Sequence, residues 1–135
     1  MSTASIQLIN RLNDPMKEIK TIRDGINPNL VERFLNEQSF VVNDVLSRLQ
    51  ISKSTYFAKK KKESPLDPAT TEKFLRLISV VKIATEIIGK VEVKSWLYKK
   101  IASLGQQAPL DLLDTEAGHR LVEETLLHIK YGVYS

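Results

Sequence analysis

Apolar side chains recur at helical spacing along most of this chain. In residues 19–26, 30–35 and 40–49 they fall three and four positions apart, which places them on one face of an α-helix. Prolines stand where helices can begin and glycines where they can end. No stretch of alternating apolar and polar residues is long enough to predict a strand. The pattern therefore predicts an all-α fold.

The most apolar of the predicted helices begins after Asp67, a natural N-cap, and ends at Gly89. Apolar residues surround it on every side, so we expect a mostly buried central helix. Charged residues interrupt it at Arg76, Lys82 and Glu86, which argues against a membrane span. Residues 1–14 are ambiguous between a helical turn and an arm.

A second helical unit is predicted after Gly89. Thr115 caps its final helix, and Gly118 in the first turn permits close packing against a neighbour. A helical wheel assigns the inner face of this helix to Gly118, Leu121, Val122, Thr125 and Ile129. The same wheel assigns the opposite side to Arg120, Glu124, Leu127 and Tyr131. Gly132 suits the end of the helix in a left-handed conformation.

Charge is distributed unevenly along the chain. The net charge is +4 and the pI is about 9.3, values that permit nucleic-acid binding. Residues 51–62 carry five lysines and no acid, whereas residues 105–135 carry two bases and five acids, a net charge of −3. This contrast suggests two surfaces with different tasks.

The basic stretch follows a pattern that resembles a helix-turn-helix. "VLSRLQISKSTYFAKKKK" reads as two short helices joined by a turn, although Gln50 stands where the motif usually has glycine and Leu46 where it has alanine. A recognition helix contacts base edges with residues near its N-terminus, here Lys53, Ser54 and Thr55. The candidate phosphate contacts are Lys59 and Lys60. The plainer interpretation is a lysine run that only faces solvent.

The sequence "WLYKKIASLGQQAPLDLLDTEAGHRLVEETLLHIKYGVYS" resembles the toxin-binding domain of the Xre/MbcA/ParS antitoxins. The matching positions are Trp96, Leu97, Leu104, Gly105, Pro109, Leu110, Leu113, Thr115, Gly118, Val122, Leu126, Ile129, Gly132 and Tyr134. The resemblance implies a bacterial cytoplasmic antitoxin that neutralises an NAD-consuming RES-domain toxin. It also implies a homodimer that represses its own operon by binding operator DNA. Related ParS-type pairs use an ADP-ribosylating toxin.

This resemblance divides the chain into two expected domains. Residues 1–89 would form a helix-turn-helix DNA-binding domain with dimerisation helices, and residues 90–135 a small helical toxin-binding domain. In the family the C-terminal tail blocks the toxin's NAD pocket. The expected toxin contacts are Arg120, Glu124, Leu127, Tyr131, Gly132, Val133, Tyr134 and Ser135.

Few residues suit catalysis or metal binding. Cysteine is absent, and the two histidines, His119 and His128, lie on opposite faces of one predicted helix. His119 and Glu123 form a weak acid–base pair, but a surface helical pair is the commoner meaning of that spacing. We expect no enzyme activity, cofactor or metal. Two alternatives stay open: a stand-alone dimeric repressor, and a helical interaction module without a DNA role.

Overall fold

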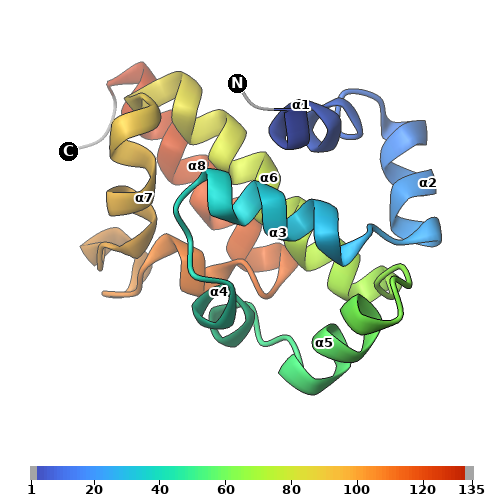
Figure 1. Ribbon diagram of the computed structural model, residues 1–135. Coiled ribbons are helices and arrows are strands. Elements are labelled where there is room, and N and C mark those ends of the chain that lie inside the picture. Colours follow the sequence, from blue (N-terminus) through green and yellow to red (C-terminus); the bar gives the residue numbers. More distant parts are fainter. Residues whose placement is uncertain (1–2, 133–135) are drawn as a thin grey trace. The chain divides into compact units, whose positions relative to one another are not determined.

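The computed structural model describes residues 3–132, which are mostly helical (Figure 1). Within this range there are eight α-helices and two short 3-10 helices, and the single β interaction is an isolated bridge between Ile101 and Gln107. The all-α prediction is confirmed. The elements are α1 (Thr3–Asn10), α2 (Pro15–Asp24), α3 (Pro28–Glu37), α4 (Val42–Arg48), α5 (Lys53–Lys61), α6 (Pro68–Ile88), α7 (Lys90–Tyr98), η1 (Ala102–Leu104), η2 (Pro109–Leu112) and α8 (Glu116–Tyr131).

The chain forms two compact units, Met1–Leu75 and Arg76–Ser135, which we call the N-terminal and C-terminal units. The division falls within α6, whose first part belongs to the N-terminal unit and whose remainder belongs to the C-terminal unit. It precedes residue 89, where the sequence suggested a boundary between functional domains. That functional boundary stays a prediction. No described helix is long and apolar enough to span a membrane.

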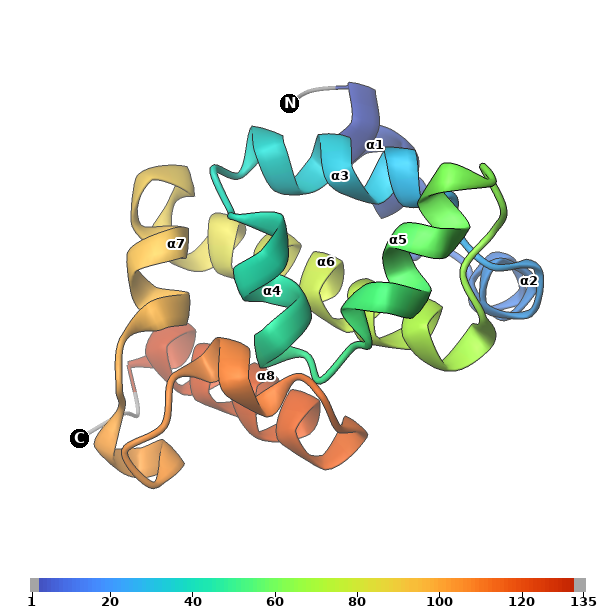
Figure 2. The same ribbon diagram turned by 60° about the horizontal axis from the view of Figure 1, so that its bottom comes forward.

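Helix α3 is the centre of the N-terminal unit, with α1, α4 and α5 packed against it (Figures 1 and 2). Its buried face presents Val31, Phe34 and Leu35 to these neighbours. Of residues 1–14, which were ambiguous in the sequence, Thr3–Asn10 form the helix α1, which buries Ala4 and Leu8. Burial of these apolar side chains is the main force that holds short helices of this kind together.

Helices α3, α4 and α5 all end in the same way. Each is followed by a non-glycine residue with positive φ, and the next amide donates to the carbonyl five residues earlier in the helix, as in a Schellman motif. The three residues are Ser39, Gln50 and Glu63, and the donated bonds are Phe40 to Leu35, Ile51 to Leu46 and Ser64 to Lys59, each 2.9 Å. These hydrogen bonds end each helix and fix the backbone of the following turn, although none of the three turns has the glycine that usually occupies this position.

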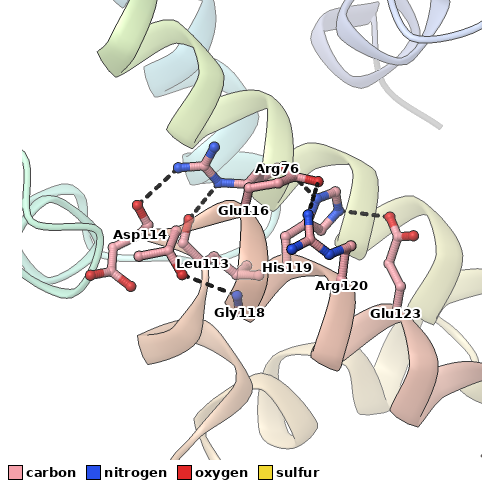
Figure 3. Close-up of polar contacts among 9 residues, drawn as sticks. Arg76, Leu113, Asp114, Glu116, Gly118, His119, Arg120 and Glu123 are labelled. Carbon is pink, nitrogen blue, oxygen red and sulfur yellow. Dashed lines mark hydrogen bonds and ion pairs between the residues drawn. The ribbon is translucent and has the colours of Figure 1, made fainter.

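In the C-terminal unit, η2 packs against both α7 and α8. The side chains of Leu97, Leu110, Val122 and Leu126 are fully buried there. Arg76 of α6 fixes the segment that connects η2 to α8 (Figure 3). Its guanidinium donates to the carbonyl oxygen of Leu113 at 2.8 Å and to that of Asp114 at 2.9 Å. The start of α8 is therefore held by two charge-assisted hydrogen bonds.

The inner face of α8 matches the predicted face only in part, because Leu126 is buried in addition and Ile129 is only half-buried. Gly118, Val122, Thr125 and Leu126 are buried, whereas Leu121 is 50% exposed, so the placement of Leu121 inside was wrong. The wheel groups residues by angle alone, and Leu121 lies at the flank of the face that contains Val122 and Leu126. Leu126, which the wheel did not place on this face, is fully buried instead.

Candidate functional sites on α5 and α8

The predicted base-contacting residues lie together at the start of α5. Lys53, Ser54 and Thr55 are exposed in its first turn, and the Ser52 hydroxyl caps that turn by accepting the amide of Thr55 at 3.3 Å. A residue of α6 stabilises the turn between α4 and α5, because the ammonium of Lys73 donates to the carbonyl of Gln50 at 2.8 Å. Figure 2 shows α4, the turn and α5. The local structure thus presents this end of α5 to solvent.

Tyr56 anchors α5 to the N-terminal core. The side chain is buried, and its hydroxyl donates to the carbonyl of Pro28 at 3.3 Å. Burial raises the pKa of Tyr56 well above its usual range, and the nearby Glu32 carboxylate raises it further. The hydroxyl therefore stays protonated and remains a donor.

The four consecutive lysines at the end of α5 have different surroundings. Lys60 forms an ion pair with Glu32 of α3, with 2.7 Å between its ammonium nitrogen and the carboxylate. Lys61 is exposed, while Lys59 and Lys62 line a shallow concavity of about 390 Å³ together with Ser54, Thr55, Ala58 and Ser64. The sequence predicted Lys59 and Lys60 as phosphate contacts, and that role stays a prediction for both. Lys62 and Ser64 also line this concavity, although the sequence did not predict them as site residues.

On α8, four of the predicted toxin-contacting residues form one exposed line. Arg120, Glu124, Leu127 and Tyr131 follow one another at intervals of three and four, and we call this line the outer stripe. Leu127 is 44% exposed and Tyr131 is 66% exposed. Gly132 ends the helix with φ of 66°, in the left-handed conformation that was predicted. Val133, Tyr134 and Ser135 lie outside the described residues.

A groove adjoins the outer stripe at Leu127. Its volume is about 390 Å³, and it is lined by Ile83, Glu86 and Ile87 of α6 and by Leu127, Ile129 and Lys130 of α8. Sequence reasoning missed the α6 residues of this groove. Helix α6 is apolar on all sides, so no periodicity distinguished its partly exposed isoleucines from its core.

The start of α8 is tightly packed and polar. Thr115 caps it by accepting the amide of Gly118 at 3.0 Å (Figure 3). His119 Nε2 lies 2.7 Å from a carboxylate oxygen of Glu123, an ion-pair distance without the alignment of a hydrogen bond. Glu116 lies 3.6 Å from the other ring nitrogen. His119 thus has the helical pairing that its spacing predicted. Among residues 3–132 no three histidine or acidic side chains gather as a metal site.

Comparison with known proteins gives this geometry a context. The model of the antitoxin Xre/MbcA/ParS C-terminal toxin-binding domain matches residues 84–132. The match includes the end of α6, the outer stripe and most residues of the groove. A curated relative from a Sphingobium species, named Prs ADP-ribosylating antitoxin, is 25% identical over 134 residues, covering 90% of this chain and 82% of that protein.

A second relative is Antitoxin Xre from Photorhabdus laumondii subsp. laumondii. It is 22% identical over 116 residues, covering 84% of this chain and 78% of that protein. Antitoxins of this kind are generally not enzymes, which agrees with the expectation drawn from the sequence. The family model and both relatives thus agree: residues 84–132 match the toxin-binding domain of the Xre/MbcA/ParS antitoxins, and most of the chain is similar to two antitoxins.

Proposed function

We propose that this antitoxin neutralises an NAD-consuming RES-domain toxin through α8 and represses its own operon by binding operator DNA through α5. The proposal includes action as a homodimer in the bacterial cytoplasm. The observation that carries it is the outer stripe. Within the segment matched by the toxin-binding family, α8 buries Val122 and Leu126 on one face and leaves Leu127 and Tyr131 exposed on the other.

The chemistry of the outer stripe suits a protein partner. Tyrosine offers a rigid aromatic surface with a polar tip, and arginine and tyrosine are enriched among the residues that dominate binding energy. Leu127 is continuous with the groove that contains Ile83 and Ile87, so an apolar side chain of the toxin has a concave surface to enter. Arg120 and Glu124 surround this apolar region with charge, as interface rims do.

The chain continues from Gly132 into Val133, Tyr134 and Ser135, which we propose reach the toxin's NAD pocket. This part of the proposal rests on the resemblance of the "YGVYS" ending to the family pattern. The left-handed conformation of Gly132 supports it, because a residue of this kind ends a helix and redirects the chain.

For operator binding, the support lies in the first turn of α5. Lys53, Ser54 and Thr55 are exposed there, Lys59 and Lys60 follow on the same helix, and the stretch from residue 51 to 62 has no acid. A helix that presents such donors at its N-terminus fits the major groove. The alternative of a stand-alone dimeric repressor would use the same helix but leave the outer stripe without a role.

A second candidate toxin follows from one relative's name, which refers to ADP-ribosylation. The test is co-expression of this chain with the toxin encoded beside it, followed by measurement of growth and cellular NAD. We expect restored growth, restored NAD and a stable toxin complex on size-exclusion chromatography. In cells that express the toxin alone, a mass increase of the toxin's target, with NAD only slightly depleted, would select the ADP-ribosylating candidate. Absence of both rescue and complex would contradict neutralisation.

A further inference from the structure

Lys60 is turned toward the core of the N-terminal unit and away from the rest of the lysine run. Its partner Glu32 is 17% exposed in its side chain, and the Lys60 ammonium also lies 5.9 Å from the centre of the Phe57 ring. Tyr56, one turn earlier, makes its own link to α3 through the carbonyl of Pro28. Two successive turns of α5 are thus linked to α3, one by a hydrogen bond and one by an ion pair.

Lys59 and Lys62 occupy a different side of α5. They line the concavity with the hydroxyl residues Ser54, Thr55 and Ser64, and the lining contains no acidic side chain. Ser64 is held there because the Schellman motif at the end of α5 turns the chain back, with its amide donating to the carbonyl of Lys59 at 2.9 Å. Two ammonium groups and three hydroxyls make a lining rich in donors that suits a phosphate oxygen.

One acidic group lies within electrostatic reach of Lys59. Burial raises the pKa of Asp67, but its hydrogen bonds with Thr70 and, to a smaller extent, the Lys59 charge lower it below the usual value. The Asp67 carboxylate accepts the amide of Thr70 at 3.1 Å and the Thr70 hydroxyl at 2.7 Å. Asp67 is therefore engaged as the cap of α6. Among residues 3–132, Lys59 has no ion pair like the one that Lys60 makes with Glu32 at 2.7 Å.

The concavity is continuous with the predicted base-reading turn, because Ser54 and Thr55 belong to both. When a helix lies in the major groove, the phosphate backbone runs along its side and fixes its register. We propose, resting on the DNA-binding function above, that DNA phosphates bind at Lys59 and Lys62 in this concavity, while Lys60 is a tether that positions α5.

The test measures how the affinity for a mixed-sequence DNA duplex depends on salt, by fluorescence anisotropy with the full chain. Each neutralised phosphate contributes about 0.9 to the slope of log affinity against log salt. We expect Lys59→Ala and Lys62→Ala each to reduce that slope by about 0.9. The matched control is Lys61→Ala, which removes the same charge from an exposed position outside the concavity and should leave the slope unchanged.

Lys60→Ala should leave the slope unchanged and lower the melting temperature. Glu32→Gln should lower it similarly, and the double variant should be no less stable than the worse single variant, since both remove one interaction. Equal slope losses at Lys59, Lys60 and Lys61, or unchanged slopes at Lys59 and Lys62, would overturn the inference while leaving DNA binding intact. A wild-type chain that binds no duplex at low salt would overturn the DNA-binding function itself.

Discussion

At Gly118 the backbone of α8 lies directly against the carbonyl of Leu112 at the end of η2. A Cβ atom at this position would collide with the Leu112 carbonyl group. The close packing expected there from the sequence is therefore confirmed, and its cause is backbone contact. Glycine is normally unfavourable inside a helix, so its presence reflects this approach and not helix propensity.

Gly118→Ala tests this contact. Alanine favours the helix by about 1 kcal/mol over glycine, but overpacking against backbone typically costs about 1–3 kcal/mol. We expect a net loss of stability, measured as a lower midpoint in thermal or urea unfolding. The control is Ala117→Gly, one residue earlier on the exposed side, which should show only the modest loss of propensity. A higher midpoint for Gly118→Ala would refute the proposed steric role.

At Gln50 the sequence of the α4–α5 turn departs from the usual motif, which has glycine at this position. The φ of Gln50 is 57°, in the region where glycine is favoured, and the carbonyl is held by Lys73. Gln50 therefore adopts the backbone conformation that glycine usually adopts in this motif, and the Lys73 ammonium helps to stabilise it. Lys73 lies in α6, so the sequence around the turn gives no sign of this support.

Among the elements, α5 could be predicted most fully from the sequence. Ser52 as its cap and Tyr56 as its buried anchor follow from local residue types. The pairing of Lys60 with Glu32 does not, because the two residues are 28 positions apart and either could equally face solvent. Prediction by periodicity identifies which side of a helix is apolar but not which distant charge meets it.

Two other helices show the same limit. In α1 the buried residues include Ala4 and Ser5, small side chains that give a weak pattern, so residues 1–14 were ambiguous. In α6 the pattern is too uniform: apolar residues occur on every side, so the sequence does not show that Ile83 and Ile87 line a groove. Only the packing of neighbouring elements shows which of these side chains stay accessible.

At the level of α5, replacing both Lys53 and Ser54 by alanine should weaken binding to the operon's upstream DNA. Each good contact to a base edge is worth about 1–3 kcal/mol of discrimination, so the preference over mixed-sequence DNA should fall markedly. Both residues are exposed, so folding and toxin binding should be retained. Gel-shift titrations at fixed salt measure this, and unchanged affinity for upstream DNA would exclude this turn as the reading element.

For the whole molecule, the two short stretches of contrasting charge belong to different compact units. The basic stretch of residues 51–62 belongs to the N-terminal unit, and the acidic stretch of residues 105–135 belongs to the C-terminal unit. Under the proposed function, DNA binds to the N-terminal unit and the toxin binds to the C-terminal unit. This separation predicts that substitutions can remove one activity without the other.

The central claim, that α8 binds the toxin through its outer stripe, is tested most directly by the affinity of the purified toxin for Leu127→Glu. The matched control is Val91→Glu, a valine that is 90% exposed on α7 of the same unit. Loss of a central interface residue typically costs at least about 2 kcal/mol, so Leu127→Glu should weaken binding by roughly 30-fold or more. Val91→Glu should bind as the unaltered chain does. Wild-type affinity for Leu127→Glu, or an equal loss in both variants, would contradict the account.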